Sequence, residues 1–70
     1  MPSEKQYISF VQDVLITIHA NIRELNERKG FADPDELPHI DGKLMAYQEI
    51  LATLRMSAEE FGIPKGETGI

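Results

Sequence analysis

The sequence predicts an all-α fold, an antiparallel two-helix hairpin that dimerises into a four-helix bundle. Apolar residues recur in alternating steps of three and four along two long stretches, which is the spacing of one face of an α-helix. A short connection rich in Asp, Pro and Gly separates the two stretches. The chain has 70 residues and no cysteine, so a partner chain is the simplest way to complete its core.

The first helix is expected over about residues 4–29. Ser3 is a suitable N-cap, and Gln6, three residues later, completes a capping box. At the other end, Gly30 is the residue expected to turn left-handed and stop the helix.

The connection is expected over residues 30–36, and its sequence leaves two possible starts for the second helix. Asp33 as a cap, Pro34 in the first helical position and Glu36 in the third form one N-terminal signal. The alternative is a single tight turn, with the main helix beginning near Pro38. A short connection between helices of similar length predicts that they lie antiparallel.

The second helix is expected over about residues 37–61. Gly62 and the following Pro64 form a strong stop signal, and residues 64–70 are expected to be a flexible tail. Gly42 is unusual within a helical pattern; either it belongs to an irregular start or it permits a close backbone approach.

Each helix carries an apolar seam of the a/d heptad type found in coiled coils. Tyr7 and Val14 widen the first seam, and Ile50 widens the second. The first seam contains Ile8, Val11, Leu15, Ile18, Ile22 and Leu25. The second seam contains Leu37, Ile40, Leu44, Tyr47, Leu51, Leu54, Ala58 and Phe61. Apart from Ala58, these seam residues are the expected oligomer interface.

Self-association follows from the breadth of these seams. Two helices that touch along one line bury only part of each stripe, whereas a second hairpin covering several hundred Å² would contribute roughly 10 kcal/mol at about 25 cal/mol per Å². A homodimer is the commonest such assembly. A second, scattered apolar set allows either ordinary surface residues or another interface, for a tetramer or a protein partner. That set contains Phe10, Ile16, Met45, Ala52 and Met56.

The composition narrows the classes of function. Twelve acidic against seven basic residues give a net charge of −5, which disfavours binding to nucleic acid or to an anionic membrane surface. No apolar run approaches the length of a membrane span, and the first residues lack the pattern of a signal peptide. We therefore expect a small complete protein of the cytoplasm.

No constellation of residues predicts catalysis, a metal site or a cofactor. His19 and His39 are the only histidines, and an antiparallel hairpin places them far apart. The acidic residues near the start of the second helix are explained by capping and dipole effects. Tyr47 is expected in the core with its hydroxyl at a polar edge, and Asn21, beside the seam, is a candidate for fixing the register.

The expected layout resembles that of Rop, a small plasmid protein whose two-helix hairpin dimerises and binds an RNA–RNA complex. The resemblance covers architecture over roughly residues 4–61 and no sequence motif. It implies RNA binding as an alternative function, through the basic residues Arg23, Arg28 and Lys29, although their position also suits the helix dipole. The favoured function is that of a small, non-catalytic, oligomeric protein-interaction or regulatory protein.

Overall fold

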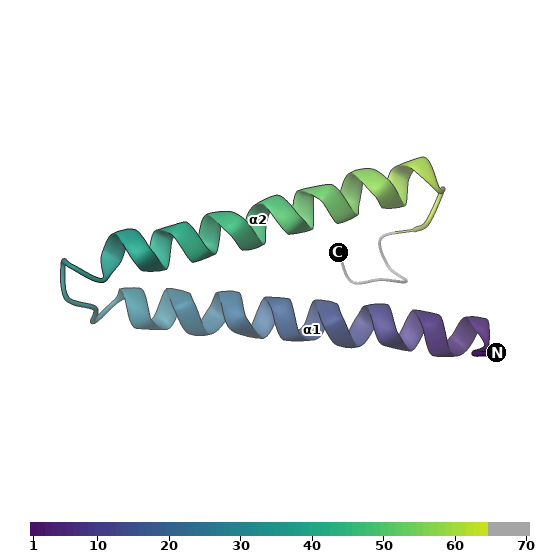
Figure 1. The fold of residues 1–70 in the computed structure, drawn as a ribbon, viewed down its shortest axis with the longest axis horizontal. Helices are drawn as coiled ribbons and strands as arrows, with labels where there is room; N and C mark the ends of the chain where they lie inside the picture. Colours follow the sequence, from purple (N-terminus) through teal and green to yellow (C-terminus); the bar gives the residue numbers. More distant parts are fainter. Residues whose placement is uncertain (65–70) are drawn as a thin grey trace.

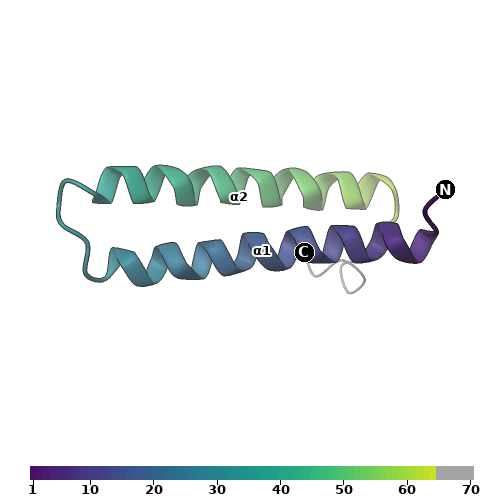
Figure 2. The same ribbon diagram turned by 60° about the horizontal axis from the view of Figure 1, so that its bottom comes forward.

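The computed structural model describes residues 1–64 as two helices, α1 (Glu4–Lys29) and α2 (Leu37–Glu60). Figures 1 and 2 show the helices side by side and antiparallel, joined at one end by a short connection. Residues 1–64 contain no strand, which confirms the all-α hairpin. Helix α2 ends one residue earlier than expected, and most of the expected flexible tail, from residue 65 onward, lies outside the described residues.

Helix α1 begins with the predicted capping box. The Gln6 backbone N–H donates to the Ser3 hydroxyl oxygen at 3.3 Å, and the Ser3 backbone N–H donates to the Gln6 side-chain oxygen at 2.7 Å. These two bonds satisfy N–H groups that have no partner within the helix, so the sequence itself defines where α1 starts.

The end of α1 differs from the prediction for Gly30. Its φ of −68° and ψ of −19° are right-handed, so it does not reverse the chain as a left-handed glycine would. The helix instead tightens, because Gly30 N–H donates to the Glu27 carbonyl and Phe31 N–H donates to the Arg28 carbonyl, both at 3.1 Å. Bonds of this i to i−3 kind are common in the last turn of a helix.

Helix α2 starts in the second of the two expected ways. Asp33 and Glu36 close a separate turn, in which Glu36 N–H donates to the Asp33 carbonyl at 2.9 Å. The helix then begins at Leu37 with Pro38 in its first turn, and Glu36 makes no side-chain cap. The start at Asp33 and Pro34 is therefore wrong for α2: Pro38 lacks only an N–H that the helix would leave unpaired there anyway.

Helix α2 ends in a Schellman motif. Gly62 has a φ of +68°, its N–H donates to the Glu59 carbonyl at 3.1 Å, and Ile63 N–H donates to the Ala58 carbonyl at 2.8 Å. Pro64 follows and cannot continue the helix. The predicted stop is confirmed.

Gly42 fits neither of its two predicted roles. It lies within α2, beyond the irregular start, and no side chain or distant backbone atom lies within 4 Å of a Cβ built on it. It therefore permits no close approach, and nothing in the structure explains a glycine at this position.

The core is a thin line of seam residues between the two helices. The buried hydrophobic residues of the described chain are Leu15, Leu25, Ile40, Leu51 and Ala58. The half-buried seam residues are Val11, Ile18, Ile22, Leu37, Leu44, Tyr47 and Leu54. Ile8 and Phe61 are exposed at the end where the helices diverge in Figure 1. One hairpin therefore covers only part of each seam.

Candidate interaction surface

One broad side of the hairpin is distinguished by a groove between the helices. Its walls combine apolar, amide and charged side chains, and it has a volume of about 430 Å³. The lining residues are Asn21, Glu24, Leu25, Arg28, Lys43, Ala46, Tyr47 and Ile50. Because most of these side chains are exposed, the groove is a shallow surface feature and not an enclosed pocket.

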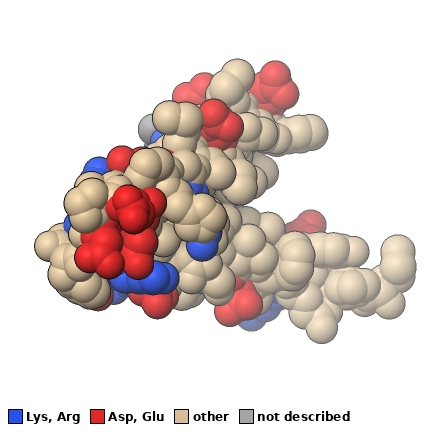
Figure 3. All heavy atoms as spheres, turned by 60° about the vertical axis from the view of Figure 1, so that its left-hand side comes forward, with Lys and Arg blue, Asp and Glu red and all other residues tan. Residues whose placement is uncertain are grey.

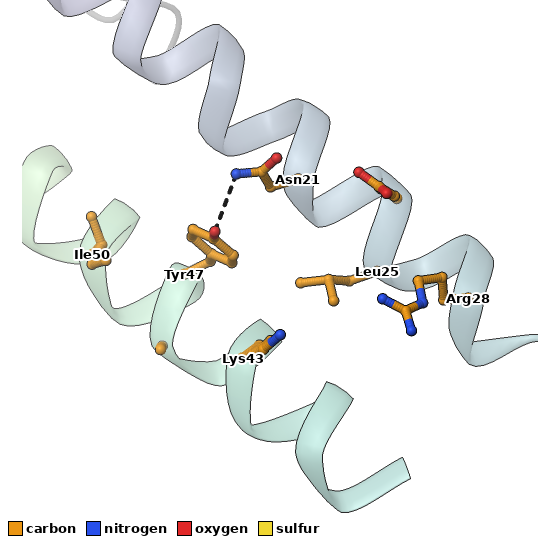
Figure 4. Close-up of a pocket in the computed structure, with 8 residues that line it drawn as sticks. Asn21, Leu25, Arg28, Lys43, Tyr47 and Ile50 are labelled. Carbon is orange, nitrogen blue, oxygen red and sulfur yellow. Dashed lines mark hydrogen bonds between the residues drawn. The ribbon is translucent and has the colours of Figure 1, made fainter. Parts of the chain in front are cut away.

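A hydrogen bond crosses the groove at mid-length. The Asn21 side-chain amide donates to the Tyr47 hydroxyl oxygen at 3.1 Å, as Figure 4 shows. This bond confirms that the Tyr47 hydroxyl has a polar partner and that Asn21 connects the two helices. It also fixes the register of the two helices. Asn21 and Tyr47 lie at the same position along the helix axes, which we call their height.

The side of the hairpin that carries this groove, which we call the open face, continues toward the end away from the connection. Residues seven apart on a helix lie on the same side, so Val14 and Tyr7 continue the line of Asn21. Tyr7 is 56% exposed, Val14 41% and Ile50 46%. An apolar strip thus runs from Ile50 in the groove to Val14 and Tyr7 beyond it, and these are the residues that were predicted to widen the seams.

On the opposite side of the hairpin, the positions that directly flank the seams are polar. On α1 the flanking positions hold Gln12, His19 and Asn26, and on α2 they hold Asp41, Gln48 and Arg55. Ile16 and Met45 are exposed on this side too, but farther from the seams. Apolar residues that directly flank the seams are confined to the open face, which identifies that face as the candidate interaction surface.

The basic residues Arg23, Arg28 and Lys29 do not form one cluster. Arg28 points into the groove near Lys43 (Figure 4), whereas Lys29 forms an ion pair with Asp41 at 2.8 Å. Arg23 and Arg28 are five residues apart, which places them about 140° apart around a helix of 3.6 residues per turn. Lys43, which the sequence analysis did not single out, is the second cation of the groove. It lies seven residues before Ile50, and this spacing could have placed it on the same side of the second helix.

Acidic and basic side chains gather at the connection end of the molecule, as Figure 3 shows. A second groove there is lined by Asp35, Glu36 and His39 together with Arg28 and Lys43. His19 lines neither of the two grooves. No group of three or more His, Asp or Glu residues in the part of the chain that the structure describes is placed to hold a metal ion.

The scattered second apolar set lies in the open. Phe10, Ile16, Met45 and Met56 are exposed. Phe31 in the connection is exposed as well, and the sequence analysis did not single it out. Within residues 1–64, neither helix is long and apolar enough to cross a membrane.

Comparisons with protein-family models, with curated proteins and with solved structures find no match to this chain.

Proposed function

We propose that this chain is a small, non-catalytic interaction protein that works as a homodimer assembled through its open face. The exposed area carries the proposal. The chain exposes 5575 Å², whereas a compact monomer of 7.9 kDa exposes about 4,400 Å². The difference of about 1,200 Å² is comparable to the roughly 800 Å² that each partner buries in a stable interface.

The position of the exposed apolar residues supports the same proposal. Tyr7, Val14 and Ile50 lie beside half-buried seam residues, so a second copy would extend an existing core. A twofold dimer uses the same patch on both chains, which needs no partner of different chemistry. The second copy would then cover the side of each seam that the helix of the same chain leaves open. The expected interface residues run from Ile8 on α1 to Phe61 on α2.

Sedimentation equilibrium over micromolar concentrations tests the proposal. The expected mass is twice 7.9 kDa, with dissociation on dilution. A folded chain that stays monomeric throughout this range would overturn it. A tetramer would show that Phe10, Ile16, Met45 and Met56 add a second interface.

RNA binding of the Rop type is the alternative, and the charges of the groove weigh against it. Arg28 and Lys43 share their grooves with Glu24, Asp35 and Glu36, so the local charge is mixed. Nucleic-acid affinity depends on unbalanced cations at the phosphates. We expect no retardation of duplex or looped RNA in a gel-shift assay at low salt, and a salt-sensitive shift would favour the alternative.

A further inference from the structure

The open face changes character along its length. Near the connection it presents charged side chains, namely Glu24, Arg28, Lys43 and Glu36. Away from the connection it presents Tyr7, Val14, Ile50, Leu54 and Phe61. The face therefore has a charged half and an apolar half, and the two halves limit how a second copy can lie on it.

The heights of these residues follow from the Asn21–Tyr47 hydrogen bond. Because the helices are antiparallel, moving seven residues back on α1 and seven forward on α2 places Val14 opposite Leu54. Toward the connection, Glu24 lines one groove with Lys43, and Arg28 lines another with Glu36. By the same register Glu24 lies opposite Leu44, so Glu24 and Lys43 are at nearly one height, whereas Arg28 lies opposite Ile40, about one helical turn from Glu36.

We propose that the two hairpins of the dimer lie with their connections at the same end. This inference rests on the proposed homodimer and adds its orientation. A twofold axis parallel to the helices lays α1 on the α2 of the partner and keeps every residue at its own height. Glu24 then faces the partner's Lys43, and Arg28 lies about one helical turn from the partner's Glu36. The symmetry repeats the Glu24–Lys43 pair, and the apolar half of one copy meets the apolar half of the other.

The reversed dimer, with connections at opposite ends, lacks this match. Full overlap would lay α2 on the partner's α2 running the other way, about a midpoint between Gln48 and Glu49. Lys43 would then face the partner's Leu54, and a charge would lie against an apolar residue at each end. Placing charges against apolar surface without a partner is unfavourable. Charge pairs across an interface select orientation more than they add affinity.

Spin labels can measure the orientation, since the chain has no native cysteine. Asp33→Cys places one label on the exposed connection of each copy. In the same-end dimer the labels are expected about 20–30 Å apart, because the bundle is about two helix diameters wide. In the reversed dimer they would lie beyond about 40 Å, because the hairpin is 47 Å long.

A mixed sample supplies the reciprocal control. Asp33→Cys copies combined with Pro2→Cys copies carry labels at opposite ends of the hairpin, so the same-end dimer gives a long mixed distance. A short mixed distance together with a long Asp33–Asp33 distance would overturn the orientation while leaving the homodimer intact. A monomer in sedimentation would instead overturn the proposed function itself, so the two failures are distinguishable.

Charge reversal gives a second, independent measurement. Lys43→Glu copies repel one another in the same-end dimer through Glu24, and Glu24→Lys copies repel through Lys43. Mixing the two variants pairs opposite charges at both contacts, so we expect mixed dimers above the random share in native mass spectrometry. A random share would contradict the proposed orientation, because residues 24 and 43 do not meet in the reversed dimer.

Discussion

Replacing Ile50 by alanine should weaken the dimer far more than it weakens a single helix. The substitution removes three carbons, and 46% of Ile50 is exposed in the single hairpin. If the dimer covers that share, the loss is about 1.1 kcal/mol per copy at about 0.8 kcal/mol per buried CH₂. Each dimer contains two copies, so the expected loss of about 2.2 kcal/mol raises Kd about 40-fold.

Ile16→Ala is the matched control for this prediction. It is the same substitution within a helix, and Ile16 is 67% exposed, more than Ile50. Ile16 lies two residues from Val14, about 200° around the helix, and so points away from the open face. Sedimentation equilibrium should give an unchanged Kd for Ile16→Ala. Equal effects of the two variants, or a change below threefold for Ile50→Ala, would refute the assignment of the interface.

Three further predictions concern the hairpin itself. Gly62→Ala forces a side chain into a left-handed φ of +68° and should destabilise the hairpin by about 1 kcal/mol. Gly42→Ala adds a methyl group in open helical space and should stabilise the hairpin by about 1 kcal/mol. Thermal unfolding in which both variants shift Tm in the same direction would contradict this. Tyr47→Phe deletes the acceptor of the cross-helix bond and should cost about 1 kcal/mol in chemical denaturation, with no loss contradicting a formed bond. Breaking the half-exposed Lys29–Asp41 pair with Asp41→Asn should cost under about 1 kcal/mol and nothing at high salt; a salt-independent loss would point to another role.

The helices and most of their ends were predictable because their signals are local. Ser3 and Gln6 form a capping box from adjacent residues, and Gly62 with Pro64 encodes the end of α2 within a few positions. Gly30 was not predictable in the same way. Glycine adopts left- and right-handed φ almost equally well, so the path of the connection decides between them.

The open face was only partly predictable. Tyr7, Val14 and Ile50 could be assigned to the flanks of the seams from spacing alone. Which α2 flank lies beside Asn21, and therefore that Lys43 shares a groove with Glu24, depends on the rotation and relative height of two helices. Periodicity within one helix contains no information about either quantity, so the groove needed the tertiary structure.

Two polar contacts between the helices fix their relative height, the Asn21–Tyr47 bond and the Lys29–Asp41 ion pair. The seams repeat every seven residues, so moving one helix by seven residues along the other still places apolar residues against apolar residues. Burial alone therefore does not define the register. Such a slip would place Tyr47 opposite Val14 and Asn21 opposite Ile40, where neither polar group finds its present partner. Because both groups are only half-buried, losing this bond costs about 1 kcal/mol, which favours the observed register. Glu24 and Lys43 lie level only in that register, so the Asn21–Tyr47 bond helps to determine how two copies of the chain can meet.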